Sequence, residues 1–215
     1  NQIIIDFDRG AIHAIELANG NIIKGETPFF SVKLRDEKGK TRIISAFDCE
    51  FKAFDGKCAR YSHKDVEISV CITQKDDGLL WRLNARNKTA ELLEWVELAS
   101  FGVAEKLQDE EGGIGAIVYP YNEGALVTDM SKRMSSPFTY IEPEYPSLGK
   151  YSIFPNMISS QFLSYIANNC GVYLGFHDEE RTTKHIDFCY GNGCIKLQIR
   201  AYCNVDYKEN YEMPF

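Results

Sequence analysis

The residue pair with the most suggestive chemistry is His177-Asp178, which follows the apolar run 172–176. An imidazole and a carboxylate at the end of a strand can hydrogen-bond the hydroxyl groups of a ligand such as a sugar. Adjacent residues of a strand face opposite sides, so both side chains reach one site only if a turn begins at Asp178. The alternative is an aspartate that anchors a loop beside a half-buried histidine. The residues by themselves favour this alternative.

Aromatic residues form a second candidate site, because they crowd the stretch 137–154. Aromatic faces on loops can stack on sugar rings, whose axial hydrogens form an apolar patch. The alternative is that these side chains cap the end of a hydrophobic core. The residues that we consider for carbohydrate contact are therefore Tyr140, Tyr145, Tyr151, His177 and Asp178. Trp81 and Trp95 lie within apolar runs, so we predict that both belong to the core.

No catalytic residue is predicted. The chain has 31 acidic residues, and no pair of them stands out as the two carboxylates that cleave a glycosidic bond. A Gly-x-Ser-x-Gly turn is missing, so a serine hydrolase has no support. No two cysteines have Cys-x-x-Cys spacing and the four histidines are dispersed, so we expect no metal site and no cofactor.

The cysteines bear on the compartment of the protein. Their number is odd, so they cannot all form disulfides within one chain; they are Cys49, Cys58, Cys71, Cys170, Cys189, Cys194 and Cys203. Cys189 and Cys194 flank a turn and can approach one another. We nevertheless favour small buried thiols for all of them, since free cysteine behaves as a small hydrophobic residue. This interpretation favours the cytoplasm, although the sequence leaves the localisation unknown.

Strand patterns dominate the chain and must position these residues. Alternating or continuous runs of β-forming residues occupy the segments 3–7, 29–34, 42–47, 66–73, 79–85, 114–119, 172–177 and 195–202. The two runs within 66–85 flank Lys75-Asp76-Asp77-Gly78, which predicts an antiparallel hairpin. The segments 89–99 and 159–167 fit a helix or a strand, and for 89–99 the neighbouring strands favour a strand.

These elements predict one all-β domain over residues 1–215, an antiparallel sandwich with little helix. The irregular stretch 105–149 is interpreted as long loops on that sandwich. The formal net charge of −7, with lysine and arginine scattered singly, argues against a nucleic-acid partner. No apolar run approaches the ~20 residues of a membrane-spanning helix, so we expect no membrane partner either.

Three segments carry a family resemblance. Residues 80–87 (LWRLNARN) resemble a W-x-hydrophobic-x-hydrophobic-x-N strand, and residues 119–124 (YPYNEG) resemble the proline–glycine crossing that follows it. Residues 171–178 (GVYLGFHD) resemble a GLYLGxHD hairpin and are the most specific part. Together they resemble the galactose-mutarotase-like supersandwich domain that lies on the N-terminal side of large, poorly characterised bacterial glycoside hydrolases.

The resemblance implies an antiparallel β-supersandwich whose partner is the catalytic (β/α)₈ barrel of the same parent chain. The catalytic carboxylates would lie on that barrel, and the chain would be a non-catalytic domain that supports it and contacts carbohydrate. The five candidate residues would then face either the barrel or the sugar. A standalone carbohydrate-binding module is the alternative. A mutarotase-like isomerase that uses His177 or His185 as general acid or base is the third hypothesis. It ranks last because the separated histidine and glutamate of true mutarotases have no match in this sequence.

Overall fold

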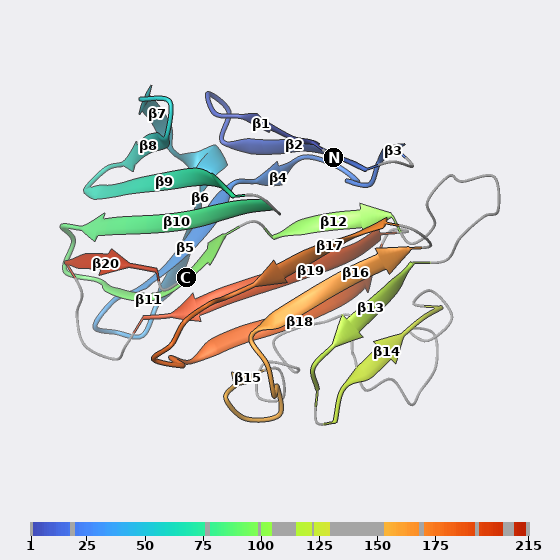
Figure 1. The fold of residues 1–215 in the computed structure, drawn as a ribbon. Helices are drawn as coiled ribbons and strands as arrows, with labels where there is room; N and C mark the ends of the chain where they lie inside the picture. Colours follow the sequence, from blue (N-terminus) through green and yellow to red (C-terminus); the bar gives the residue numbers. More distant parts are fainter. Residues whose placement is uncertain are drawn as a thin grey trace.

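The computed structural model describes residues 2–17, 20–75, 78–98, 100–104, 115–121, 123–129, 153–167, 170–191, 194–203 and 209–213 (Figure 1). Within these ranges every paired strand is antiparallel, and the helical structure consists of the 3₁₀ turn Ala46–Asp48. The predicted all-β antiparallel fold with little helix is therefore confirmed. The strands form four sheets, and each of the eight predicted strand segments overlaps a strand of the structure.

A five-stranded sheet carries the predicted hairpin. Its strands, in spatial order, are β20 (Asn210–Glu212), β10 (Gly78–Asn87), β9 (Val66–Lys75), β8 (Cys58–His63) and β7 (Glu50–Phe54). The hairpin prediction is confirmed, since β9 and β10 pair along their whole length from Lys75 opposite Gly78 to Val66 opposite Asn87. Figure 1 shows β20, in red, beside the green β10, so a segment near the end of the chain completes this sheet.

The largest sheet has seven strands. Six of them follow the spatial order β15 (Ile153–Phe154), β18 (Lys184–Gly191), β19 (Cys194–Tyr202), β11 (Leu92–Leu98), β5 (Phe30–Arg35) and β6 (Thr41–Ser45), and β12 (Phe101–Ala104) also pairs with β19. The ambiguous segment 89–99 therefore contains a strand, β11, as its strand neighbours predicted.

Two four-stranded sheets complete the fold. One consists of β1 (Gln2–Asp6), β2 (Ala11–Leu17), β3 (Gly20–Asn21) and β4 (Thr27–Pro28). The other has the order β14 (Ala125–Val127), β13 (Ala116–Tyr119), β16 (Phe162–Ala167) and β17 (Cys170–Gly175). The second ambiguous segment, 159–167, thus also contains a strand.

Residue alternation explains how these sheets acquire an inner and an outer face. In β9 the side chains of Val66, Ile68 and Val70 are buried, whereas Glu67 between the first two is exposed. Successive strand residues point to opposite faces, so such a pattern buries one face and leaves the other to solvent. The buried apolar residues of all four sheets form one contiguous cluster. Trp95 is buried as predicted, and Trp81 is partly buried with its ring 5.1 Å from that of Phe29.

Candidate functional site

The structure separates the two side chains of the predicted pair His177-Asp178. Asp178 is buried and its carboxylate anchors the loop between β17 and β18. Its Oδ1 accepts a hydrogen bond from the backbone N–H of Glu180 (3.0 Å), and its Oδ2 accepts one from the N–H of Thr182 (2.8 Å). The interpretation of Asp178 as a loop anchor is therefore confirmed. His177 differs from that interpretation, because its side chain is exposed rather than half-buried.

Asp178 also forms a buried ion pair with Lys184, the first residue of β18. The Lys184 ammonium group donates to the carboxylate of Asp178 and to the carbonyl and hydroxyl oxygens of Thr182. It also lies over the rings of Phe154 and Phe176, 5.7 and 5.3 Å from their centroids. Because all three ammonium protons have partners within the chain, this cluster holds the loop together and is closed to a ligand.

His177 lies instead beside an exposed aromatic cluster. Its ring is 6.3 Å from that of Tyr173, which in turn stacks on Phe162 at 5.7 Å. Phe162 lies opposite Gly175 in the pairing of β16 with β17. The Tyr173 side chain covers this glycine, since a Cβ atom added at Gly175 would lie only 2.4 Å from the Tyr173 hydroxyl oxygen. His177 therefore remains an accessible candidate. The candidates Tyr140, Tyr145 and Tyr151 lie outside the described residues.

A row of polar residues crosses the large sheet and contains His185, the histidine of the isomerase hypothesis. Glu97 of β11, Arg200 of β19 and His185 of β18 lie in register, and Arg200 Nε donates to Glu97. Burial and the positive charge of Arg200 lower the pKa of His185 to about 3, so its imidazole is neutral at pH 7. His185 and Glu97 are both buried, so a sugar has no access to them in this structure.

An accessible groove of about 620 Å³ lies on the outer face of the five-stranded sheet. We call it the polar groove, because two rows of polar side chains line it, each with one residue from β8, β9, β10 and β20. The first row is Ser62, Glu67, Arg86 and Asn210, and the second is Arg60, Ser69, Asn84 and Glu212. Such hydroxyl, amide and charged groups are the donors and acceptors that bind the hydroxyl groups of a sugar.

The charges of the polar groove are largely balanced by neighbours. Glu67 accepts a hydrogen bond from Lys88, which lowers the pKa of Glu67, and Arg86 lies 3.9 Å from the same carboxylate. Glu212 lies 3.0 Å from Arg82, which is outside the lining. Both carboxylates are therefore partnered by cations, and their oxygens can also accept hydrogen bonds from a ligand.

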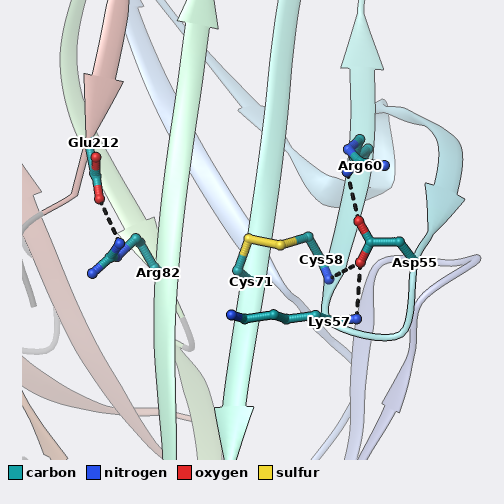
Figure 2. The surroundings of a disulfide bond; sticks show 7 residues. All are labelled: Asp55, Lys57, Cys58, Arg60, Cys71, Arg82 and Glu212. Atoms are coloured by element: carbon teal, nitrogen blue, oxygen red, sulfur yellow. Dashed lines mark hydrogen bonds and ion pairs between the residues drawn. A yellow bond between two sulfur atoms is a disulfide. The ribbon is translucent and has the colours of Figure 1, made fainter.

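A disulfide bond joins β8 and β9 on the same face of this sheet (Figure 2). Cys58 and Cys71 lie directly opposite each other on β8 and β9, with their sulfur atoms bonded. On this face of the sheet they form the row that follows Arg60 and Ser69, with the pair of Ala59 and Val70 between them facing the other side. Figure 2 also shows Asp55, which accepts hydrogen bonds from the backbone of Cys58 (2.8 Å) and from the guanidinium of Arg60 (2.7 Å). The bond therefore ties a groove-lining strand to its neighbour.

The disulfide overturns part of the sequence interpretation. The assignment of all cysteines as free thiols is wrong for Cys58 and Cys71. Because disulfides persist mainly in oxidising compartments, the bond argues against the cytoplasm that the odd cysteine count favoured. Cys194 is a free thiol opposite Gly191, which agrees with the favoured interpretation of this cysteine as a thiol. The side chain of Cys189, its possible neighbour across the turn, lies outside the described residues.

Sequence reasoning missed the polar groove because its residues are far apart and individually ordinary. The available signal was the outward polar alternation along 58–62, 67–71 and 82–86, once these segments are accepted as adjacent strands. The contribution of Asn210 and Glu212 had no such signal, since it depends on β20 joining the same sheet. Spacing along the chain therefore carries too little information to locate this site.

Comparisons with known proteins do not assign this chain or its groove to a family. No family model, curated protein or solved structure matches the chain. Among the described residues, no group of three or more histidine, cysteine, aspartate or glutamate side chains is arranged to hold a metal ion. The same residues include no helix with the length and apolar character needed to cross a membrane. The class that fold and site define is thus an all-β antiparallel protein with a polar, solvent-accessible groove.

Proposed function

We propose that this chain is a non-catalytic β-sandwich domain of a glycoside hydrolase that contacts carbohydrate through the polar groove. The observation that carries the proposal is the pair of cross-strand rows, which present uncharged and charged hydrogen-bonding groups together on one accessible surface. Ser69 and Asn84 occupy neighbouring positions on the central strands β9 and β10, and both are half-buried. Groups held on paired strands are well ordered, which reduces the entropic cost of binding.

The location of the ionisable residues supports a binding role over a catalytic one. His185 lies 3.8 Å from the carboxylate of Asp187, and both side chains are buried on a different sheet from the polar groove. The groove itself has no histidine in its lining. An isomerase of the mutarotase type needs an acid and a base that both reach the sugar, so this chemistry has less support than binding.

Glycan binding is tested with a panel of immobilised neutral and acidic polysaccharides. We expect binding by the wild-type chain and loss of that binding in Ser69→Trp, because an indole on β9 would fill the centre of the groove. Ile43→Trp is the matched control, since Ile43 is an exposed residue of β6 in another sheet. Binding that survives Ser69→Trp, or a wild-type chain that binds no glycan of the panel, would refute the groove as the carbohydrate site.

A second part of the proposal, support of a catalytic barrel, is favoured by the outer face of the sheet β14-β13-β16-β17. The residues Leu126, Val118, Ser164 and Tyr173 lie in one cross-strand row on this face, with Leu126 60% and Tyr173 56% exposed. Ile166, 40% exposed, extends the same face. Exposed apolar side chains gathered on one face are typical of a surface that contacts another protein or domain.

Two measurements test the docking proposal. The source gene should encode, in the same reading frame, a segment with alternating strand and helix patterns that forms a barrel. In that longer protein Tyr173→Ser should raise protease sensitivity at the junction, whereas Ile43→Ser on another sheet should not. A gene without such a segment would refute the docking role. It would leave the binding proposal for the polar groove intact, since that proposal rests on a separate surface.

A further inference from the structure

We infer that the polar groove selects acidic saccharides, and that Arg86 binds the carboxylate of a uronic acid unit. This inference rests on the proposed carbohydrate-binding function and deepens it by naming the class of sugar. Arginine is suited to this task, because its planar guanidinium group can bind both oxygens of a carboxylate at once.

The arrangement of charges around Glu67 distinguishes Arg86 from the other cations of the groove. Lys88 donates directly to Glu67, whereas Arg86 approaches the same carboxylate only to 3.9 Å. The three side chains together carry one net positive charge, and the side chain of Arg86 is 52% exposed. A second carboxylate, brought by the ligand, would therefore complete the charge balance of this group rather than disturb it.

The remaining cations of the groove are already partnered at short range. Arg60 donates to Asp55 at 2.7 Å, and Lys52 lies 2.6 Å from Glu50. Glu212 is balanced by Arg82 in the same way. Each of these pairs is neutral, so the excess positive charge lies at Arg86 of the lining and at Lys88, which lies beside the groove and contacts Glu67. The chain as a whole has a formal charge of −7, which makes a local positive site a distinct feature of this surface.

The neighbours of Arg86 can bind the rest of the sugar unit. Asn210 lies opposite Arg86 on β20, and Asn84 lies two residues away on the same face of β10. Each amide supplies both a donor and an acceptor for ring hydroxyl groups. One uronic acid unit therefore finds a cation for its carboxylate and amides for its hydroxyls within two adjacent rows of the sheet.

Matched polymers test the inference. The affinities of the full chain for polygalacturonate, alginate and glucuronoxylan are compared, by calorimetry, with those for the same polymers after chemical reduction of their carboxyl groups. We expect at least one acidic polymer to bind about tenfold more tightly than its reduced form, as one charge-assisted contact at a surface site provides. Added NaCl should weaken this preference, because salt screens exposed charges.

Two variants assign the preference to a residue. Arg86→Gln should abolish the discrimination between acidic and reduced polymer, so that the two forms bind this variant with equal affinity. Arg9→Gln is the control, because Arg9 pairs with Glu26 outside the groove lining and should retain the full preference. Equal binding of both forms by the wild type, or a preference that persists in Arg86→Gln, would overturn the inference and leave carbohydrate binding standing. Absence of binding to every polymer, acidic, neutral or reduced, would overturn the proposed function as well.

Discussion

Removal of the Asp178 carboxylate is the sharpest test of how this fold is held together. In Asp178→Asn the side chain keeps its size but loses its charge, so the Lys184 ammonium remains buried without a counterion. Asparagine can still accept the hydrogen bond from the N–H of Glu180 through one oxygen. Its amide group, however, faces the N–H of Thr182 and the Lys184 ammonium, which are donors themselves. The substitution therefore places donors against donors in a buried site.

The expected loss of stability is large for a conservative change. The side chains of Asp178 and Lys184 are 4% and 0% exposed, so water cannot replace the lost partner. Breaking one side of a buried ion pair costs about 3–5 kcal/mol of the free energy of unfolding, because the other charge stays buried. Replacing both partners removes that charge. The double variant Asp178→Asn/Lys184→Met should accordingly be more stable than Asp178→Asn alone.

Acid provides an independent measure of the same pair. Burial raises the pKa of Asp178, but hydrogen bonds from Lys184 and Thr182 outweigh it and lower the pKa from 3.8 to about 2. The folded state therefore holds this proton less tightly than the unfolded state. The ionised Asp178 therefore stabilises the folded state by about 2 kcal/mol above pH 4, and this contribution is lost as the pH falls towards 2. Asp178→Asn should lack this part of the acid sensitivity.

Urea unfolding followed by tryptophan fluorescence measures these differences at pH 7 and along a pH series. Glu179→Gln is the matched control, since Glu179 is the exposed neighbour of Asp178 and its substitution should change the free energy of unfolding by less than about 0.5 kcal/mol. A loss below 1 kcal/mol in Asp178→Asn would refute the buried ion pair as a stabilising element. The single variant Lys184→Met completes the comparison. If the double variant loses as much free energy of unfolding as Asp178→Asn and Lys184→Met lose together, the coupling of the two charges is refuted.

Three further outcomes follow from buried or cross-linked groups. Reduction of the disulfide Cys58–Cys71, whose cysteines are separated by 13 residues, should lower the free energy of unfolding by about 3 kcal/mol. Urea unfolding with and without dithiothreitol measures this loss, and identical curves would contradict a cross-link that constrains the unfolded chain. Tyr165→Phe should cost about 1–2 kcal/mol in thermal unfolding, because the Ala104 carbonyl loses its 2.6 Å donor; a neutral effect would argue against that bond. The lowered pKa of His185, about 3, means that the unfolded state binds the proton first, so stability should fall from pH 6.5 towards 3. The variant His185→Gln should lack this contribution, so its stability should fall less over this pH range than that of the wild type.

The sequence by itself determined the class of fold and several local elements. Period-two alternation predicted the strands, and the acidic turn before Gly78 predicted the antiparallel hairpin of β9 and β10. It also favoured the correct role of Asp178 as a loop anchor, because an aspartate directly after an apolar strand can accept hydrogen bonds from the backbone that follows. These features depend on residues close in the chain, so local residue types suffice to predict them.

Only the tertiary structure decided the sites. The polar groove exists because β20 joins β10 and brings Asn210 beside Arg86, more than a hundred residues earlier in the chain. Cys58 meets Cys71 because the register of β8 with β9 places them opposite each other. His185, an ordinary histidine by its sequence neighbours, is buried in register with Arg200 and becomes hard to protonate. Strand register and burial are properties of the packed sheets, and many pairings are compatible with the same alternation, so neither can be obtained from residue order alone.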